Sequence, residues 1–348
     1  MRSSLKLSFL IVKMSSLGDI LQSLDCAAYL KTRFPDCRVD WIVESRFASL
    51  VQSSPYLDEV FSIDIKNLKK TPFKFFMELR CFRKKLQMRR YDVLWDLQGN
   101  CKSALFTYFC HSKDKVGFGK NSVAEWPNLI VRNISYEVDQ TLPISKQYLS
   151  LLKNYFQDTQ EQELRPHILK SLTNTTFINL SSKRKIMVCP GSNWINKQLS
   201  EETLLQFLQL LKKTYDPFFV LIWGNEKEKA LVTGIAATLS EDVLVVGNLD
   251  LAVWQDLMCL MDFVIAVDSS ALHLAALANV ATFSIFGPSC SKVYKPFGDK
   301  HTAYAGVCPY GQTFIKRCSQ LRGCKTGACM KKITAEALMQ KFSFMSKK

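Results

Sequence analysis

Residues 7–34 read LSFLIVKMSSLGDILQSLDCAAYLKTRF, and this stretch decides the fold class. A short apolar run, Leu7–Val12, leads through a turn of small residues into the amphipathic pattern Ile20–Phe34. A buried strand followed directly by a helix is typical of a parallel sheet that is covered by helices on both faces. The stretch therefore predicts a doubly wound α/β fold.

The same alternation continues along the chain. Further strands are expected at Val39–Val43, Val60–Ile63, Val93–Asp96, Ile186–Cys189, Phe218–Ile222, Val243–Val246, Phe263–Val267 and Ala281–Phe286, and further helices at Phe73–Arg90, Glu201–Thr214 and Glu226–Leu239. The polar stretch Ser171–Lys185 divides the strands into two groups. We therefore expect two doubly wound domains, residues 1–170 and 186–348, joined by a linker over residues 171–185. Such domains would place a ligand cleft between their strand carboxyl ends.

The chain is strongly basic. Of its 348 residues, 46 are Lys or Arg and 31 are Asp or Glu, which gives a formal net charge of +15. This excess predicts an anionic partner: a phosphate-bearing donor, an acidic lipid surface or a nucleic acid. A nucleic acid is the least favoured of the three, because the sequence contains no recognisable nucleic-acid-binding module.

The apolar runs are short. No stretch reaches the roughly 18 consecutive apolar residues that a membrane-spanning helix requires. The run Leu7–Val12 lies between Lys6 and Lys13 and lacks a small-residue cleavage site, so it is predicted to be a buried strand and not an export signal. We expect a cytoplasmic protein with at most peripheral membrane contact.

Two groups stand out among the twelve cysteines. The first group stands singly in apolar stretches and is expected to be reduced and buried: Cys26, Cys81, Cys110, Cys189 and Cys259. The second group is C-terminal and comprises Cys308, Cys318, Cys324 and Cys329. Its spacings contain no CxxC pair, and they leave a structural zinc site and reduced structural thiols both open.

Three turns between a strand and a helix carry polar residues. The first reads Lys13-Met-Ser-Ser-Leu-Gly-Asp19. Asp19 at this position is typical of a carboxylate that satisfies free amides at a helix start. A carboxylate at the carboxyl end of a strand could also act as a general base. Both interpretations of Asp19 follow from the local sequence.

The second turn opens the second half of the chain and reads Cys189-Pro-Gly-Ser-Asn-Trp-Ile-Asn-Lys197, followed by Gln-Leu and the predicted helix cap Ser200. A Gly/Ser/Asn turn at this position suits a diphosphate, with Lys197 as the charged partner. The alternative is an ordinary capped helix with a solvated lysine.

The third turn follows the apolar run Phe263–Val267 and reads Asp268-Ser-Ser-Ala-Leu-His273. Backbone amides at the start of the following helix would favour an anion. His273 is predicted to be either a core histidine or a residue of this site. Phe286-Gly-Pro-Ser289 forms one more small turn at the same edge of the predicted sheet.

Together these segments resemble the ADP-heptose–lipopolysaccharide heptosyltransferases, glycosyltransferase family nine. The turn around Asp19 is similar to the family's Lys-x-Ser-Ser-x-Gly-Asp signature, and Asp268–His273 with Phe286-Gly-Pro is similar to its donor-site signature. Tyr91-Asp-Val-Leu-Trp-Asp96-Leu-Gln98-Gly99 with Lys102-Ser103 resembles a loop of its first domain. Trp223-Gly224 with Glu228 resembles its ribose-binding segment.

The resemblance implies the GT-B fold, in which two Rossmann-like domains enclose the active site. It also implies inverting, metal-independent transfer of heptose or a related sugar, without a cofactor, from ADP-heptose to the Kdo/inner-core region of lipopolysaccharide. The acceptor would be an anionic glycolipid at the cytoplasmic face of the inner membrane. The alternative is a non-catalytic GT-B protein that binds nucleotide or glycolipid.

The family likeness also implies residue roles. Asp19 would be the base, and Lys197 would stabilise the leaving diphosphate. The donor-binding residues would be Ser192, Glu228, Asp268, Ser269, Ser270, His273, Gly287 and Pro288. The acceptor-binding residues would be Ser15, Gly18, Lys66, Lys69, Lys70, Gln98 and Lys102, although the three lysines at 66–70 could equally belong to a solvated loop.

The sequence departs from the family pattern at three places. Ser270 stands where the donor motif usually has glycine, which narrows the backbone conformations available. Leu199 stands where the family has tryptophan in its Lys-x-Trp-Pro segment. Asp139-Gln140 occupies a segment that commonly carries His and Arg. These departures put the identities of the sugar and the acceptor in doubt.

Overall fold

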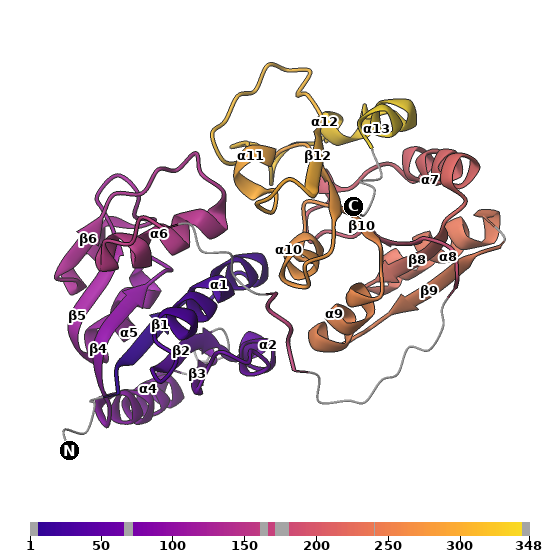
Figure 1. Cartoon of the computed structure of the whole chain (residues 1–348). Helices are drawn as coiled ribbons and strands as arrows, with labels where there is room; N and C mark the ends of the chain where they lie inside the picture. Colours follow the sequence, from indigo (N-terminus) through magenta and orange to yellow (C-terminus); the bar gives the residue numbers. More distant parts are fainter. Residues whose placement is uncertain (1–5, 66–71, 161–165, 171–180, 240, 343–348) are drawn as a thin grey trace. The chain divides into compact units, whose positions relative to one another are not determined.

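The computed structural model describes residues 6–65, 72–160, 166–170, 181–239 and 241–342. The chain divides into two compact units, each built around one sheet (Figure 1). The first unit comprises Met1–Gln140 and Ile144–Lys170. The second comprises Thr141–Pro143 and Ser171–Lys348.

The first unit contains a six-stranded parallel sheet with the strand order β3-β2-β1-β4-β5-β6. Its strands are β1 (Ser8–Val12), β2 (Arg38–Glu44), β3 (Glu59–Ile63), β4 (Arg90–Asp96), β5 (His111–Phe118) and β6 (Ile134–Tyr136). Val12 of β1 pairs in register with Ile42 of β2 and with Asp96 of β4. The turns that follow these strands therefore begin at one edge of the sheet.

Helices cover both faces of this sheet, as the ribbon in Figure 1 shows. They are α1 (Leu17–Arg33), α2 (Ala48–Gln52), α4 (Pro72–Gln87), α5 (Cys101–Phe109) and α6 (Ile144–Phe156), with 3-10 turns at η1 (Ser45–Phe47) and η2 (Trp126–Val131).

Strand β1 is buried on both faces, which explains why its sequence is a continuous apolar run. Leu10 belongs to a core cluster that also contains Phe82 of α4 and Phe106 of α5. Phe9 points to the opposite face, because side chains alternate along a strand. Its ring lies 5.4 Å from that of Trp95 in β4 and 6.2 Å from that of Phe156 in α6.

The second unit repeats this plan with the order β12-β11-β10-β7-β8-β9. Its strands are β7 (Lys185–Cys189), β8 (Phe218–Trp223), β9 (Val243–Gly247), β10 (Phe263–Val267), β11 (Thr282–Phe286) and β12 (His301–Ala305). Its helices are η3 (Ile195–Lys197), α7 (Glu201–Tyr215), α8 (Glu226–Leu239), α9 (Leu251–Cys259), α10 (Ser270–Leu277), α11 (Ser291–Tyr294), α12 (Ala328–Lys331) and α13 (Ala335–Lys341). The ring of Phe342 contacts those of Phe207 and Phe283 at 6.1 and 5.4 Å.

All strands and helices that the sequence analysis predicted are present. Strands β5, β6 and β12 were not predicted from the sequence. Ser200 caps α7 by accepting a hydrogen bond from the Thr203 N–H at 3.1 Å, as predicted. No helix in the described part of the chain is long and apolar enough to cross a membrane.

The cysteine prediction was partly wrong. All twelve cysteines are free thiols, and Cys26, Cys110 and Cys189 are buried as expected. Cys81 and Cys259, however, are exposed. An apolar stretch in a helix includes residues of the solvent-facing side, and Cys81 lies beside the exposed Arg80 on α4.

Candidate active site

The strand orders indicate where each unit binds a ligand. In the first sheet β1 lies beside β4, and in the second β7 lies beside β10, so the order reverses at these pairs. Open α/β sheets bind ligands at the carboxyl ends of strands at such a switch point. The polar turns occupy these positions: residues 13–16 and 97–100 follow β1 and β4, and residues 190–194 and 268–269 follow β7 and β10.

Asp19 lies half-buried in the first turn of α1. Its Oδ2 accepts hydrogen bonds from the Ser16 backbone N–H at 3.2 Å and from Ser16 Oγ at 2.7 Å. These contacts confirm the capping interpretation, because the carboxylate satisfies an amide at the helix start. The same contacts fix the direction in which the carboxylate points. The role of Asp19 as a base stays a prediction.

Gln98 joins the two turns of the first unit. Its Oε1 accepts hydrogen bonds from the backbone N–H groups of Met14 and Ser15, each at 3.1 Å. Gln98 follows β4 and the two amides follow β1. This side chain therefore connects the two loops by hydrogen bonds. Gln98 was predicted to bind the acceptor, and in the structure its oxygen positions the turn after β1.

Asp96, at the end of β4, fixes the conformation of the same loop through hydrogen bonds. Its Oδ1 accepts the backbone N–H groups of Gln98 and Gly99 at 3.0 and 2.9 Å. Its Oδ2 accepts hydrogen bonds from Asn128 Nδ2 at 2.6 Å and from Thr107 Oγ1 at 3.2 Å. A fully buried carboxylate is tolerated when hydrogen bonds replace its hydration. Asp96 is therefore a structural residue of the loop.

Two lysines lie at this edge of the sheet, one after β1 and one at the start of α5. The buried Lys13 donates from Nζ to Tyr148 Oη at 2.8 Å and to the Leu97 carbonyl at 3.2 Å. The exposed Lys102, in the first turn of α5, has its Nζ 3.9 Å from Glu44 Oε1 at the end of β2. The predicted residues Ser15 and Gln98 thus lie in the turns after β1 and β4, and Gly18 and Lys102 lie in the first turns of α1 and α5 at the same sheet edge. Lys66, Lys69 and Lys70 lie outside the described residues.

In the second unit a buried ion pair joins the turns after β7 and β10. Lys197 Nζ lies 2.6 Å from Asp268 Oδ2, and each side chain is 8% exposed. Ser192 Oγ donates to the Asp268 carbonyl at 3.3 Å, and Gln198 Nε2 donates to the Ser192 carbonyl at 2.8 Å. The structure therefore brings together three residues that the sequence analysis assigned to the diphosphate region: Ser192, Lys197 and Asp268.

Two buried hydroxyl groups at this edge have no hydrogen-bond partner among the described residues. They are Ser269 Oγ, at the start of α10, and Ser289 Oγ, in the turn after β11. A buried hydroxyl without a partner is unfavourable by about 1–3 kcal/mol. Together with the amides at the amino end of α10, these groups can receive an anionic ligand. Ser289 was predicted to lie in a turn at this edge but was not predicted to belong to the site.

Glu228 lies close to the turn after β7. Its Oε2 accepts the Gly224 backbone N–H at 2.7 Å. A Cβ added to Gly191 would lie 2.3 Å from Glu228 Oε1, so no other residue fits at 191 without a shift. The carboxylate of α8 thus packs directly on the Pro-Gly-Ser turn. Glu228 was predicted as a site residue from the sequence, whereas its contact with Gly191 was not predicted.

His273 and Gly287 lie deeper in the unit. His273 is 6% exposed in the first turn of α10, as the core interpretation expects. Gly287 and Pro288 are buried, and a Cβ on Gly287 would lie 2.6 Å from Met330 Sδ. Gly287 is therefore required for packing against α12, and its contribution to donor binding stays a prediction.

The four C-terminal cysteines line one cavity of about 300 Å³ beside Gly287 and Pro288. Asn196 holds this segment, because its Nδ2 donates to the carbonyls of Leu321 and Cys324 at 3.0 and 2.8 Å. Among the described residues, no three His, Cys, Asp or Glu side chains are arranged to hold a metal ion.

Comparison with known proteins identifies the family. The model of glycosyltransferase family 9 (heptosyltransferase) matches residues 79–321, which is more than half of the chain and includes residues of both units. The chain belongs to glycosyltransferase family 9.

This family 9 glycosyltransferase is 26% identical over 303 residues to lipopolysaccharide heptosyltransferase 1 of Campylobacter coli, over 82% of the chain and 86% of the relative. It is similar in structure to E. coli heptosyltransferase WaaC with ADP, with a TM-score of 0.78 and 22% identity over 96% of the chain and 98% of WaaC. WaaC with ADP-2-deoxy-2-fluoro heptose gives a TM-score of 0.72, with 23% identity and the same coverage. These similarities confirm the GT-B fold that the sequence predicted.

Proposed function

We propose that this family 9 glycosyltransferase transfers heptose, or a related sugar, from an ADP-linked donor to the Kdo/inner-core region of lipopolysaccharide. The observation that carries the proposal is the edge of the second sheet. A buried lysine–aspartate pair and the amino end of α10 lie there at neighbouring strand ends, together with two buried hydroxyls that have no hydrogen-bond partner in the described part of the chain. The names of its relatives, and the ADP and ADP-2-deoxy-2-fluoro heptose in the WaaC structures, support this choice of donor and acceptor.

In this proposal the second unit binds the donor. Lys197 and the first amides of α10 offset the negative charge that grows on the leaving diphosphate. Ser192, Ser269 and Ser270 lie at the same edge and hydrogen-bond phosphate oxygens. Glu228 accepts hydrogen bonds from the ribose hydroxyls, since it lies beside the turn after β7. The buried residues His273, Gly287 and Pro288 form the inner wall of the donor site.

The first unit binds the acceptor and supplies the base. Asp19 takes the proton of an acceptor hydroxyl while its oxygen forms a bond to the anomeric carbon. The bond from that carbon to the diphosphate oxygen breaks, its electron pair leaves with ADP, and the configuration inverts. Ser15, Gly18 and Lys102, with the lysines at 66, 69 and 70, contact the acceptor. The net charge of +15 suits an anionic glycolipid at the cytoplasmic face of the inner membrane.

The experiment that tests the proposal measures nucleoside diphosphate release from a panel of nucleotide sugars, with and without Kdo-lipid. We expect release from ADP-heptose only when the acceptor is present. Release from another donor would correct the sugar. Binding of ADP-heptose without any release, under all acceptor conditions, would identify a non-catalytic GT-B protein and refute the proposed activity.

Transfer is expected to continue in EDTA. In the proposed mechanism the positive charge beside the diphosphate comes from Lys197 and the amides of α10, so no divalent ion is needed there. The measurement is the initial rate of ADP release before and after chelation, with a Mg²⁺ or Mn²⁺ add-back as control. Complete loss on chelation, restored by either ion, would show that a metal takes part.

A further inference from the structure

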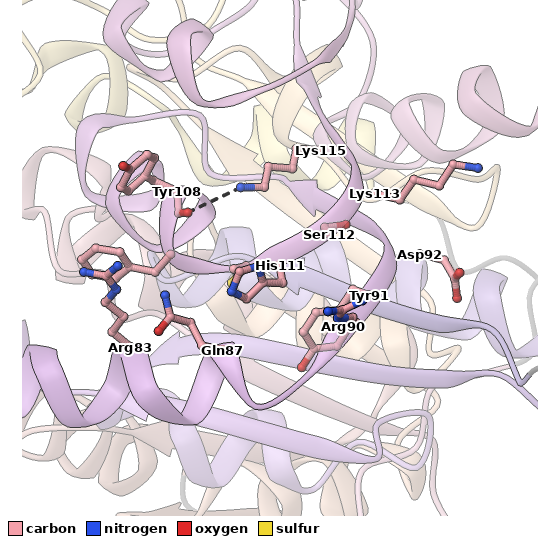
Figure 2. A pocket seen from close by; sticks show the side chains of 12 residues that line it. Arg83, Gln87, Arg90, Tyr91, Asp92, Tyr108, His111, Ser112, Lys113 and Lys115 are labelled. Atoms are coloured by element: carbon pink, nitrogen blue, oxygen red, sulfur yellow. Dashed lines mark hydrogen bonds between the residues drawn. The ribbon is translucent and has the colours of Figure 1, made fainter.

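A concave surface of the first unit lies at the opposite edge of the sheet from Asp19. It is an open pocket of about 680 Å³ between α4, α5 and the amino ends of β4 and β5 (Figure 2). We call it the basic pocket and define it by Arg83, Arg90, Tyr108, His111, Lys113 and Lys115. The catalytic turns follow the carboxyl ends of β1 and β4, so the basic pocket and the proposed active site are separate.

The charges of the basic pocket are unbalanced. Among the described residues, no carboxylate lies within ion-pair distance of Arg83, Arg90, Lys113 or Lys115. The single acidic residue of the lining, Asp92, accepts a hydrogen bond from the Ser8 backbone N–H at 2.8 Å. The lining therefore carries an excess of positive charge, which favours an anion.

Two of the cations are held in place by neighbours other than acids. The Arg83 guanidinium lies over the ring of Phe109, 5.3 Å from its centroid. Lys115 Nζ points toward the Tyr108 carbonyl at 3.5 Å, as the dashed line in Figure 2 shows. Burial lowers the pKa of Lys115, because the ammonium loses water and the neighbouring Cys110 offsets this loss only in part. An anion in the pocket would compensate for that loss.

The surroundings of the pocket indicate that this anion belongs to a lipid. Tyr108 at the rim is 66% exposed, and Met88, just after α4, is 85% exposed. Phe76, which is 65% exposed, lies two turns before Arg83 on the same side of α4. Exposed apolar side chains beside cations are typical of surfaces that enter the headgroup region of a bilayer. A soluble phosphate would not require them.

We propose that the basic pocket binds the phosphate group of an acidic phospholipid. The phosphate would contact Arg83 and Lys115, while Tyr108, Met88 and Phe76 enter the lipid surface around it. The inference deepens the proposed function, on which it rests only for the location of the enzyme at a membrane. It assigns membrane attachment to a defined site that is distinct from the acceptor site.

The test compares two double variants that lose the same charge. Arg83→Gln/Lys115→Gln changes the basic pocket. Lys84→Gln/Lys85→Gln changes exposed lysines of α4 that do not line it. Cosedimentation is measured with vesicles of phosphatidylcholine alone and of phosphatidylcholine mixed with phosphatidylglycerol. We expect wild type to prefer the mixed vesicles, the pocket variant to lose roughly tenfold or more in affinity, and the control to lose less than about threefold.

Equal losses in both variants would mean that binding follows the overall charge of α4, and would overturn the pocket. A wild type that ignores phosphatidylglycerol but gains thermal stability with inorganic phosphate, while the pocket variant does not, would mean that the phosphate is soluble and would overturn the lipid assignment. Transfer to a lipid-free acceptor should be unchanged in the pocket variant. If wild type shows no transfer, the proposed function fails, whereas vesicle binding still tests the pocket.

Discussion

An Asp19→Asn variant is expected to release ADP at about one hundredth of the wild-type rate or less, because general-base catalysis contributes roughly 10²–10⁴-fold. Asparagine keeps an oxygen in the position of Oδ2, so it can still accept the hydrogen bonds from Ser16 that fix the start of α1. Folding and donor affinity should therefore stay near wild type. The measurements are steady-state ADP release, ADP binding and thermal unfolding.

A matched variant separates chemistry from capping. Ser16→Ala removes the hydroxyl that donates to Asp19 Oδ2 and leaves the carboxylate in place. It should weaken the helix start by about 1 kcal/mol and reduce the rate by less than about tenfold. If Asp19→Asn retains more than about a tenth of wild-type activity, or Ser16→Ala is equally inactive, Asp19 is a cap and not the base.

Lys197→Met should be the most damaging substitution in the second unit. It leaves the Asp268 carboxylate, 8% exposed, without the cation that lies 2.6 Å away. Removing one partner of a buried ion pair lowers the free energy of unfolding by about 3–5 kcal/mol. The substitution also removes the proposed counter-charge of the leaving diphosphate, so transfer should fall by roughly a hundredfold or more. Urea denaturation and ADP release measure the two effects.

The double variant Lys197→Met/Asp268→Asn distinguishes these two roles. Neutralising Asp268 removes the uncompensated buried charge, so most of the lost stability should return. Activity should not return with it, because the cation for the diphosphate is still missing. A double variant that regains wild-type transfer would contradict a catalytic role for Lys197 and would reduce the pair to a structural contact.

The buried strands were predictable because burial on both faces demands a continuous apolar run, as in FVIAV of β10. Strand β5 was missed for the converse reason. Its first residues, HSKDK, are polar and lie partly or fully exposed, and only VGF enters the core. Strands β6, with three residues, and β12, with the sequence HTAYA, give equally little apolar signal. These two strands form because they pair with β5 and β11 in the folded sheets, and a local sequence pattern does not indicate this pairing.

The candidate site was predictable as a set of turns but not as a set of contacts. Turns after buried strands fall at one sheet edge, so Asp19, Lys197 and Asp268 could be chosen by position. No local pattern indicates that Gln98 binds the amides of Met14 and Ser15, because these residues are more than 80 positions apart. Leu199, which stands where the family has tryptophan, packs against the core of the second unit.

Every strand of the first sheet ends before residue 137, and every strand of the second begins after residue 184. Within the described ranges, therefore, no strand pairs with a strand from the other half of the chain. A chain of this construction is expected to melt as two cooperative blocks, and calorimetry should resolve two endotherms. A single melting temperature for the whole chain would then describe neither block, whereas ADP should shift only the endotherm of the block that binds it.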